Sequence, residues 1–343
     1  MSLDIRRKII NKIQNKYVKT VALVMHNSPD GDAIGSAVAF ERVLLKLGKK
    51  VDIIIQNKIS PGYSKIIGAN RTNKIILPQP GKMYDLLILL DCAEPDRTSV
   101  NIKQISKFII TIDHHYDVKP FGDIYLYEHS ASTGMIVYKL IKMLIPIDSI
   151  IASAIYLTIR SDTCSFKNTN TDSKAHEIAG ELLLYGADLR LINDIYDNKS
   201  ISFLKLMGYT FTNIVYDRQY KIIYLIVKID QIKKAQSTCE EASMLIDSLR
   251  GVEDVEVAFL FLEGHDNVRI KARSKIINVS EIMAHFNGGG HPNASGAIVY
   301  SDDIHSIAES VVYRTREYIN EINNEKVKNN GGKTMADSFK REI

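Results

Sequence analysis

The sequence is poor in the residues that cross-link small proteins. Its only cysteines are Cys92, Cys164 and Cys239, which lie far apart in the chain. An odd number of isolated cysteines argues against a disulfide framework and indicates a reducing compartment. None of the three lies in a CxxC pair, so a structural zinc site built on paired thiolates is not expected either.

Long apolar runs are also missing. The first 17 residues, MSLDIRRKIINKIQNKY, carry a charge every few residues. They therefore never form the continuous apolar stretch of a signal peptide or a membrane span. We expect an amphipathic helix there, in a cytoplasmic protein that has no membrane partner.

Charge of one sign is scarce as well, since the formal net charge is only +4 over 343 residues and no long basic run interrupts the chain. This balance disfavours a protein that coats duplex nucleic acid, but it leaves room for a local basic pocket. The length exceeds what one hydrophobic core usually organises, so two domains are expected.

The first half of the chain has the pattern of an α/β protein. Short apolar runs of the buried-strand type alternate with helical or loop segments, and they lie at 19–26, 50–55, 84–91 and 107–113. This alternation predicts an N-terminal doubly wound, mainly parallel sheet.

The second half begins with helical periodicity and then returns to strands. Strand signals lie at 220–229, 255–263, 267–274 and 294–300. We therefore predict a smaller C-terminal α/β domain that follows a helical linker. The expected divisions are 1–190 for the N-terminal domain, 191–215 for the linker, 216–320 for the C-terminal domain and 321–343 for a polar, disordered tail.

Polar residues end three of the predicted strands: His26, Asp91 and Asp113. Ligands of doubly wound sheets bind outside the carboxyl ends of the strands. These residues are far apart in sequence but are expected at the same edge of the sheet. This convergence predicts a functional site there.

The segment HNSPDGDAIGS, residues 26–36, places His26, Asp30 and Asp32 within seven residues. Like charges so close repel each other unless a cation or a proton lies among them. One aspartate could simply cap the following helix, but capping leaves the other aspartate and the histidine unexplained. Alternate residues can face two cations about 3.5–4 Å apart, as dinuclear sites require.

Further candidate ligands follow later strands. Asp91 ends LLILLD and could merely cap a turn, but a single carboxylate can also bridge two metals. TIDHHYD contains Asp113, His114 and His115, and neighbouring side chains on an extended segment point to opposite sides. We therefore predict that one histidine binds metal while the other faces substrate, with Asp113 fixing a tautomer. Asp162, in SDTCSF, offers another carboxylate.

The predicted metal ligands are oxygen and imidazole groups. This donor set favours Mn²⁺ or Mg²⁺ over a structural zinc, and the imidazoles favour Mn²⁺. We expect two Mn²⁺ ions, with Mg²⁺ or Co²⁺ as substitutes. The residues that could hold these ions are His26, Asp30, Asp32, Asp91, Asp162 and one of His114 and His115, and the other histidine, with Asp113, is expected to take part in catalysis.

The segment FNGGGHPNASG, residues 286–296, contains three consecutive glycines. Glycines can adopt positive φ, so their N–H groups can form an anion-binding nest, although a bare GGG is more often a flexible hairpin. The nearby cations Arg273 and Lys275, with His291, favour binding of a phosphate or a nucleotide. The predicted substrate-binding residues are Arg273, Ser274, Gly288, Gly289, Gly290 and His291.

The five motifs, in this order, resemble those of the DHH phosphoesterases that carry a DHH-associated C-terminal domain. The resemblance covers all of the chain except the polar tail, and its length is similar to that of the stand-alone, NrnA-like enzymes. Such enzymes degrade very short oligoribonucleotides (nanoRNA) and often remove the 3′-phosphate of 3′-phosphoadenosine 5′-phosphate.

The resemblance implies specific roles for the residues of the site. His26, Asp30 and Asp91 would hold one Mn²⁺, and the other would be held by Asp32, Asp91, His114 and Asp162. A water that bridges the metals would attack phosphorus, and His115 would serve the leaving group. The partners would be short single-stranded oligonucleotides or small nucleotides. Two positions depart from the family pattern: Cys164, where glycine is usual, and Ser295, where alanine is frequent.

Four other functions stay open. They are a cyclic-dinucleotide or linear dinucleotide phosphodiesterase, an inorganic pyrophosphatase or polyphosphatase, a processive single-strand exonuclease, and a non-catalytic binding protein. A processive exonuclease needs an extended basic groove with stacking aromatic side chains, and the absence of tryptophan argues against one. Closed dimers are the commonest assemblies, so a homodimer is the expected oligomeric state.

Overall fold

The computed structural model describes residues 2–330 apart from 56–58, 60, 68–74, 77–80, 93, 99, 116–118 and 198. The chain divides into two compact units, Met1–Asn198 (unit 1) and Lys199–Ile343 (unit 2). Each unit has its own sheet and its own hydrophobic core, so each is described by itself.

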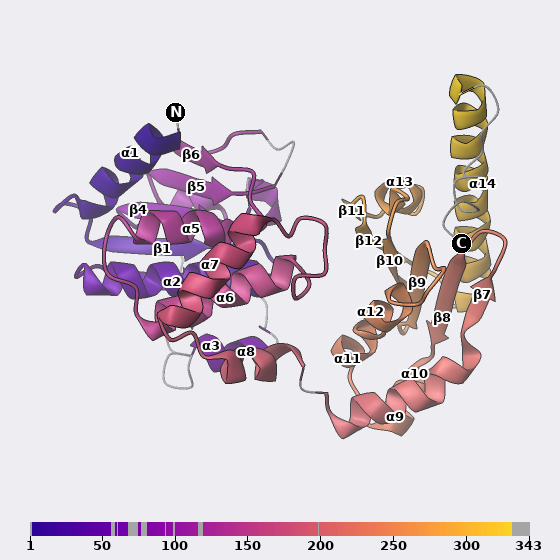
Figure 1. Ribbon diagram of the computed structural model, residues 1–343. Helices are drawn as coiled ribbons and strands as arrows, with labels where there is room; N and C mark the ends of the chain where they lie inside the picture. Colours follow the sequence, from indigo (N-terminus) through magenta and orange to yellow (C-terminus); the bar gives the residue numbers. More distant parts are fainter. Residues whose placement is uncertain are drawn as a thin grey trace. The chain divides into compact units, whose positions relative to one another are not determined.

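Unit 1 contains a six-stranded, all-parallel sheet in the order β3-β2-β1-β4-β5-β6 (Figure 1). The strands are β1 (Thr20–Val24), β2 (Lys50–Ile54), β3 (Ile75–Ile76), β4 (Leu86–Leu90), β5 (Ile109–Asp113) and β6 (Ile124–Tyr127). The order reverses direction between the central neighbours β1 and β4, which is the point where sheets of this kind bind ligands.

Helices cover the sheet of unit 1 unevenly. One large core joins a face of the sheet to helices α1 (Ser2–Gln14), α2 (Gly31–Lys46), α5 (Thr133–Ile141), α6 (Ser149–Asp162) and α7 (Ser173–Leu184). The opposite face carries a smaller core that includes α4 (Ile102–Ile105). In the chain, this helix follows the 3₁₀ helix η2 (Pro95–Arg97). Helices α3 (Pro61–Ile67) and α8 (Leu189–Tyr196) pack against each other. Because both faces are covered, the central strand β4 is apolar and buried throughout instead of alternating.

Unit 2 contains a mixed sheet in the order β11-β12-β10-β9-β8-β7. The strands are β7 (Val215–Asp217), β8 (Ile222–Val227), β9 (Val257–Glu263), β10 (Val268–Ser274), β11 (Gly289–His291) and β12 (Ala294–Val299). Strands β8 and β9 run parallel, and every other neighbouring pair is antiparallel.

The two faces of this second sheet pack against different helices (Figure 1). One face packs on α13 (Val279–Ala284) and α14 (Ile304–Asn330). The other packs on α9 (Ile201–Thr210), which leads into η3 (Phe211–Asn213), and on α10 (Ile229–Ala235), α11 (Cys239–Ser243) and α12 (Leu245–Arg250).

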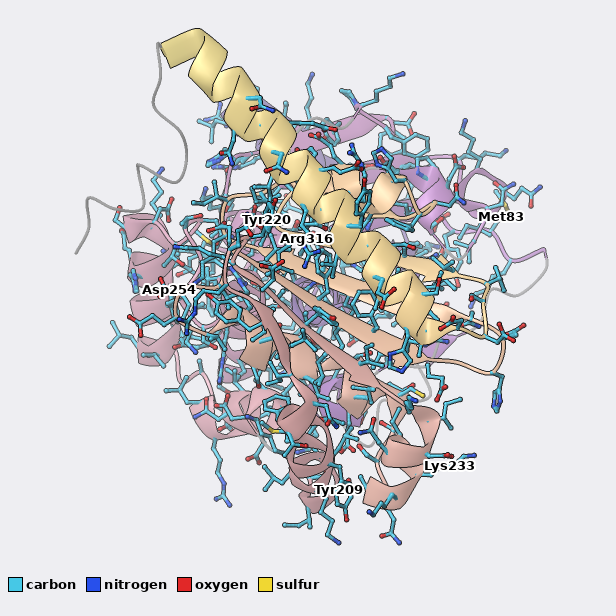
Figure 2. All side chains as sticks on the ribbon, turned by 90° about the vertical axis from the view of Figure 1, so that its right-hand side faces the viewer. Met83, Tyr209, Tyr220, Lys233, Asp254 and Arg316 are labelled. Carbon is cyan, nitrogen blue, oxygen red and sulfur yellow. The ribbon has the colours of Figure 1, made fainter. Side chains whose placement is uncertain are left out.

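Helix α14 is attached to the sheet by polar contacts as well as by its apolar face. Arg316 donates a hydrogen bond of 2.7 Å from its Nε to Asp217 Oδ2, and its guanidinium lies over the ring of Tyr220 (Figure 2). Ile319 and Ile322 pack against the core of unit 2. The expectation of a disordered tail from residue 321 is therefore wrong for 321–330, which continue this helix, and 331–343 lie outside the described residues.

The α/β class, the parallel N-terminal sheet, the helical linker and the smaller C-terminal α/β domain are as predicted, and the structure adds that the second sheet is mixed. Within the linker segment 191–215, α8 belongs to unit 1 and α9 to unit 2, where Phe203 and Leu206 join the core. Four short strands, β3, β6, β7 and β11, were not predicted. Among the described residues, no helix combines the length and the apolar character needed to cross a bilayer.

Candidate metal centre and phosphate-binding pocket

All six predicted metal ligands lie together beyond the carboxyl ends of β1, β4 and β5. They form overlapping groups in which one ligand atom from each residue lies within 4.8 Å of the others. The groups are His26, Asp30 and Asp91; Asp32, His114 and Asp162; and Asp91, His114 and His115. Asp91 belongs to two groups, and so does His114.

The position of Asp30 is compatible with both roles that the sequence left as alternatives. It is the N-cap of α2, and its Oδ1 accepts hydrogen bonds from the backbone N–H groups of Asp32 (3.0 Å) and Ala33 (3.2 Å). The same carboxyl group has an oxygen within the group formed with His26 and Asp91. Capping thus orients Asp30 and is compatible with metal binding.

Asp91 follows β4 and is only 3% exposed. Its Oδ2 lies 3.7 Å from His26 Nε2, whereas its Oδ1 lies 3.6 Å from His114 Nε2. Thr133 Oγ1 donates a hydrogen bond of 3.1 Å to Oδ1. The two oxygens therefore face different imidazoles, which is the arrangement that a bridging carboxylate needs.

The N-terminus of α5 holds the buried carboxylate of Asp32. The backbone N–H of Thr133 donates to Asp32 Oδ2 at 2.6 Å, and that of Gly134 donates to Oδ1 at 2.9 Å. A helix N-terminus stabilises negative charge through its unpaired N–H groups and its dipole. The sequence prediction missed this contribution, although the N-cap signal of Ser132 was present. At Gly134 a Cβ would lie 2.0 Å from Thr158 Oγ1, so only glycine allows α5 this close to α6.

The two adjacent histidines are oriented by different acceptors. His114 Nδ1 lies 3.0 Å from the carbonyl oxygen of Ser130, which leaves Nε2 3.2 Å from Asp162 Oδ2. His115 Nδ1 lies 2.7 Å from Asp113 Oδ1. Such acceptors fix the tautomer and the orientation of an imidazole.

The expectation that His114 and His115 point to opposite sides is wrong. Their ring centroids are 4.7 Å apart, and a nitrogen of each ring lies 3.6 Å from Asp91 Oδ1. The reason is that β5 ends at Asp113, so the alternation of an extended strand does not apply to the next two residues.

The carboxyl groups of this centre repel one another in a buried environment. Burial, together with the charges of neighbouring aspartates, raises the pKa of Asp32 and of Asp91 well above the usual range. Burial also raises the pKa of Asp162. Burial alone would lower the pKa of His114, but the hydrogen bond to Asp162 and the charge of Asp32 outweigh it and raise this pKa to about 10.

This donor set fits divalent cations. Several carboxylates and imidazoles lie within ligand distance of one another, and without a cation the buried charges must be neutralised by protons. Burial lowers the pKa of His26, so this imidazole is neutral and can offer a lone pair. Hard oxygen ligands combined with imidazole suit Mn²⁺ better than a thiolate-preferring metal.

The loop that follows Asp162 has unusual backbone geometry. Cys164, Ser165 and Phe166 have φ values of 49°, 60° and 65°, in the left-handed region that favours glycine. Arg160 supports the loop by donating from Nε to Ser165 Oγ at 3.1 Å. The family's usual glycine at the position of Cys164 would suit this conformation, so the departure carries a conformational cost.

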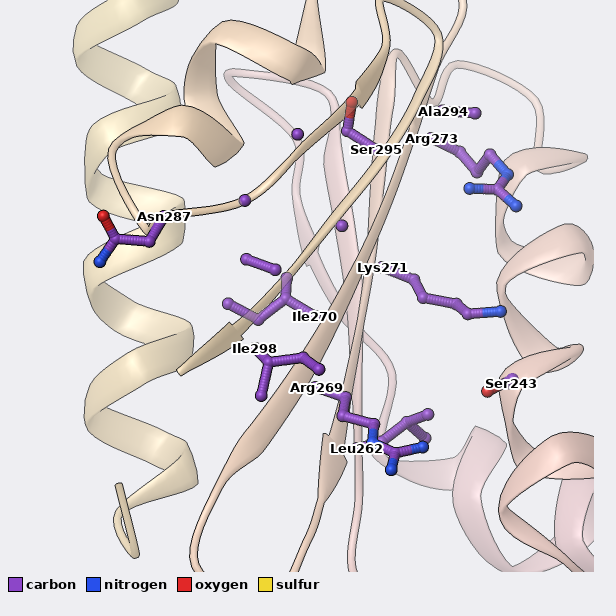
Figure 3. A pocket seen from close by; sticks show the side chains of 14 residues that line it. Ser243, Leu262, Arg269, Ile270, Lys271, Arg273, Asn287, Ala294, Ser295 and Ile298 are labelled. Carbon is purple, nitrogen blue, oxygen red and sulfur yellow. The ribbon is translucent and has the colours of Figure 1, made fainter. Parts of the chain in front are cut away.

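Unit 2 contains a pocket of about 640 Å³ (Figure 3). Among the predicted substrate-binding residues, Arg273, Gly288 and Gly289 line it. The glycine segment is a hairpin in which β11 pairs with β12, which was the alternative to a nest. The N–H of Gly288 donates to the carbonyl of Met283 at 2.9 Å and is therefore used within the fold. A Cβ at Gly288 would lie 2.3 Å from the carbonyl oxygen of Gly296, so glycine permits this close approach.

The other three predicted substrate-binding residues, Ser274, Gly290 and His291, do not line this pocket. Ser274 is buried, and its Oγ accepts hydrogen bonds from the N–H groups of Ile276 (3.2 Å) and Ile277 (2.7 Å). His291 is exposed at the end of β11, and its carbonyl accepts a hydrogen bond of 2.8 Å from Ser295 Oγ. Gly290, with φ 143°, lies between the pocket residues and His291.

The fold and the cluster of aspartates and histidines define a phosphoesterase, and the chain belongs to the DHH family of hydrolases. The N-terminal domain of the DHH family matches residues 20–159, and the DHHA1 domain matches residues 219–334.

Two relatives and one solved structure match most of the chain. It is 29% identical to the "Bifunctional oligoribonuclease and PAP phosphatase NrnA" of Bacillus subtilis, over 83% of this chain and 90% of that protein. It is 30% identical to the "Probable bifunctional oligoribonuclease and PAP phosphatase NrnA" of Streptococcus mutans, over 86% and 94%. A crystal structure of an exopolyphosphatase-related protein from Bacteroides fragilis has the same fold, with a TM-score of 0.83 at 23% identity over 93% and 96% of the two chains.

Proposed function

We propose that this protein hydrolyses short oligoribonucleotides, the 3′-phosphate of 3′-phosphoadenosine 5′-phosphate, or both, with two metal ions. The observation that carries the proposal is the position of Asp91. Its two oxygens lie between one group formed with His26 and Asp30 and another formed with His114 and His115. The relatives named as oligoribonucleases and PAP phosphatases support the choice of substrate.

The ligands divide into two sets. His26, Asp30 and Asp91 would hold one ion, and Asp32, Asp91, His114 and Asp162 would hold the other; we propose Mn²⁺ for both. When bound, such a pair lowers the pKa of a water molecule and neutralises charge on the phosphoryl oxygens. The hydrogen bonds to Asp32 from the N-terminus of α5 keep this carboxylate in place before a metal binds.

His115 is the proposed proton donor to the leaving oxygen. Asp113 Oδ1 accepts from the Nδ1–H of this imidazole, so Nε2 is the nitrogen that exchanges a proton with a substrate. Burial alone would raise the pKa of Asp113, but the hydrogen bond and the charge of His115 outweigh it and lower this pKa. The carboxylate thus stays ionised and fixes the orientation of the His115 ring.

The substrate-binding residues belong to unit 2. Arg273 offers a planar guanidinium that can bind a phosphate with two hydrogen bonds, and Gly288 and Gly289 leave the pocket open beside it. His291 lies on the same hairpin. We propose that this region holds the nucleotide end of the substrate that does not react.

A panel of substrates tests the proposal. With Mn²⁺ present, the purified protein is offered a diribonucleotide, a longer RNA, 3′-phosphoadenosine 5′-phosphate, a cyclic dinucleotide and pyrophosphate at equal concentration. We expect the highest kcat/KM for the diribonucleotide or the bisphosphate nucleotide, and no turnover in a chelator. Turnover restricted to pyrophosphate or to the cyclic dinucleotide would instead assign the protein to one of those alternative functions.

A further inference from the structure

Strand β10 carries three cations on one face. Arg269, Lys271 and Arg273 are alternate residues, so their side chains leave the sheet on the same side. All three line the pocket of about 640 Å³, and Figure 3 shows their long side chains extending in the same direction. Only Arg273 was singled out by the sequence motifs.

The neighbouring strand leaves this row of cations accessible. In the antiparallel pairing with β12, Arg269 lies opposite Ile298, Lys271 opposite Gly296 and Arg273 opposite Ala294. The short side chains opposite Lys271 and Arg273 leave room above the strand.

The row is poorly neutralised by the protein. Arg273 Nε lies 3.9 Å from Asp247 Oδ1, and the Asp247 side chain is largely exposed. Within the described part of the chain, the side chains of Arg269 and Lys271 make no hydrogen bond and no ion pair within 4.0 Å, although the charge of Asp247 also acts on Lys271. Burial and the charge of Arg273 lower the pKa of Lys271, so a bound anion would stabilise its charged form.

We propose that this row binds successive phosphates of a single-stranded oligonucleotide, with Lys271 and Arg269 contacting phosphates beyond the one bound at Arg273. The inference rests on the proposed function and deepens it, because it assigns oligonucleotides with several phosphates as the preferred substrates. Alternate residues of a strand are about 6.7 Å apart, a spacing comparable to that of consecutive phosphates in an extended strand.

Apolar surface beside the row favours a nucleic acid over an inorganic polyphosphate. Ile298, which lines the pocket opposite Arg269, is 53% exposed and supplies this surface. Riboses and bases can cover such surface, whereas a chain of phosphates has no apolar part that could do so.

The first test is binding without hydrolysis. A fluorescently labelled tetraribonucleotide is titrated with the full-length protein in EDTA, comparing wild type with Lys271→Gln, Arg269→Gln and the matched control Lys233→Gln. Lys233 is an exposed lysine on α10 in the same unit (Figure 2), so this control loses the same charge outside the pocket. We expect each pocket variant to raise Kd about tenfold and to reduce the salt dependence of binding by about one phosphate contact.

Further measurements separate the outcomes. Lys271→Arg retains the charge and should restore binding, whereas equal Kd values for wild type and both glutamine variants would overturn the inference. Tripolyphosphate that competes as well as an unlabelled tetraribonucleotide would overturn the assignment to nucleic acid.

Hydrolysis provides an independent readout. With Mn²⁺, Lys271→Gln should reduce kcat/KM for a tetraribonucleotide about tenfold more than for 3′-phosphoadenosine 5′-phosphate, which has fewer sites of contact. An equal loss of kcat/KM on both substrates would contradict the proposal that this row of cations binds successive phosphates. A wild-type protein that binds RNA through these cations but hydrolyses no nucleotide would overturn the proposed function and leave this inference standing.

Discussion

The two units of this protein carry clusters of opposite charge: carboxylates in unit 1 and cations in unit 2. Unit 1 buries carboxylates that repel each other and holds them with backbone N–H groups, hydroxyls and imidazoles. Unit 2 places three cations on one partly exposed sheet face, and the exposed carboxylate of Asp247 is the acidic group that acts on both Lys271 and Arg273. Buried like charges require a cation or protons, whereas partly exposed like charges are screened by water. The first site is therefore suited to metals and the second to a flexible polyanion.

The two sites also differ in how the chain builds them. The candidate metal ligands come from segments around residues 26–32, 91, 113–115 and 162, which meet because strands β1, β4 and β5 end at the same edge and α6 brings Asp162 to it. The three cations of the pocket come from the single strand β10. A substitution in unit 1 should thus act on chemistry, and one in unit 2 on binding.

The largest expected effect is that of Asp91→Asn. Asp91 has a φ of 57°, and asparagine tolerates this left-handed conformation better than alanine does, so the backbone is preserved. Loss of the charge that joins the two ligand sets should cost several kcal/mol of transition-state stabilisation, or about 10³-fold in kcat/KM. Steady-state kinetics with Mn²⁺ measures this loss.

The exposed residue Asp4 provides the control, since Asp4→Asn removes the same charge from unit 1 far from the site in sequence. RNA binding in EDTA should be unchanged by Asp91→Asn if unit 1 carries out the chemistry and unit 2 binds the substrate. Mn²⁺-dependent turnover at the wild-type rate in this variant would contradict a bridging role for Asp91.

The next largest effect is the response of unit 1 to Mn²⁺. Burial and the neighbouring carboxylates raise the pKa values of Asp32 and Asp91, so the metal-free fold retains protons that the unfolded chain has released. This contribution to stability is present at low pH and is lost as the pH rises through the raised pKa values. A saturating metal, at about 100 times its Kd, adds about 2.7 kcal/mol and should offset this loss.

Mn²⁺ should therefore raise the melting temperature more at about pH 8 than at about pH 5.5, as measured by calorimetry. Hydrogen exchange can locate the effect: protection should increase around residues 26–36 of unit 1 and not along β10 of unit 2. Equal stabilisation at both pH values would show that the metal does not displace protons from these carboxyl groups.

The smallest expected effect concerns backbone strain beside the metal site. Cys164 has a φ of 49°, so Cys164→Gly should relieve about 1 kcal/mol and raise the melting temperature of unit 1 by about 2–4 °C. Cys239→Gly is the matched control, because Cys239 is also exposed but begins helix α11, where glycine gives no gain. A melting temperature that stays unchanged or falls in Cys164→Gly would show that the loop accommodates cysteine without strain.

Local sequence patterns were sufficient to predict the long apolar strands and the polar residues at their ends. The runs that contain β1, β4 and β5 are buried on both faces of the sheet. Strand β11 was not predictable, because its sequence, GGH, has no strand propensity and it pairs only through β12. The helix at 321–330 was hidden by its polar composition, since α14 gains stability from the packing of its earlier turns.

The sequence by itself determined the types of ligand at the metal centre, because oxygen and imidazole groups at the ends of apolar strands define the metals they suit. Only the tertiary structure decided that both histidines turn toward Asp91 and that the N-terminus of α5 holds Asp32. It also decided that Ser274 faces a turn while Lys271 and Arg269 face the pocket. The physical reason is that residue type fixes chemistry locally, whereas the direction of a side chain depends on strand ends, pairing register and helices that are distant in sequence.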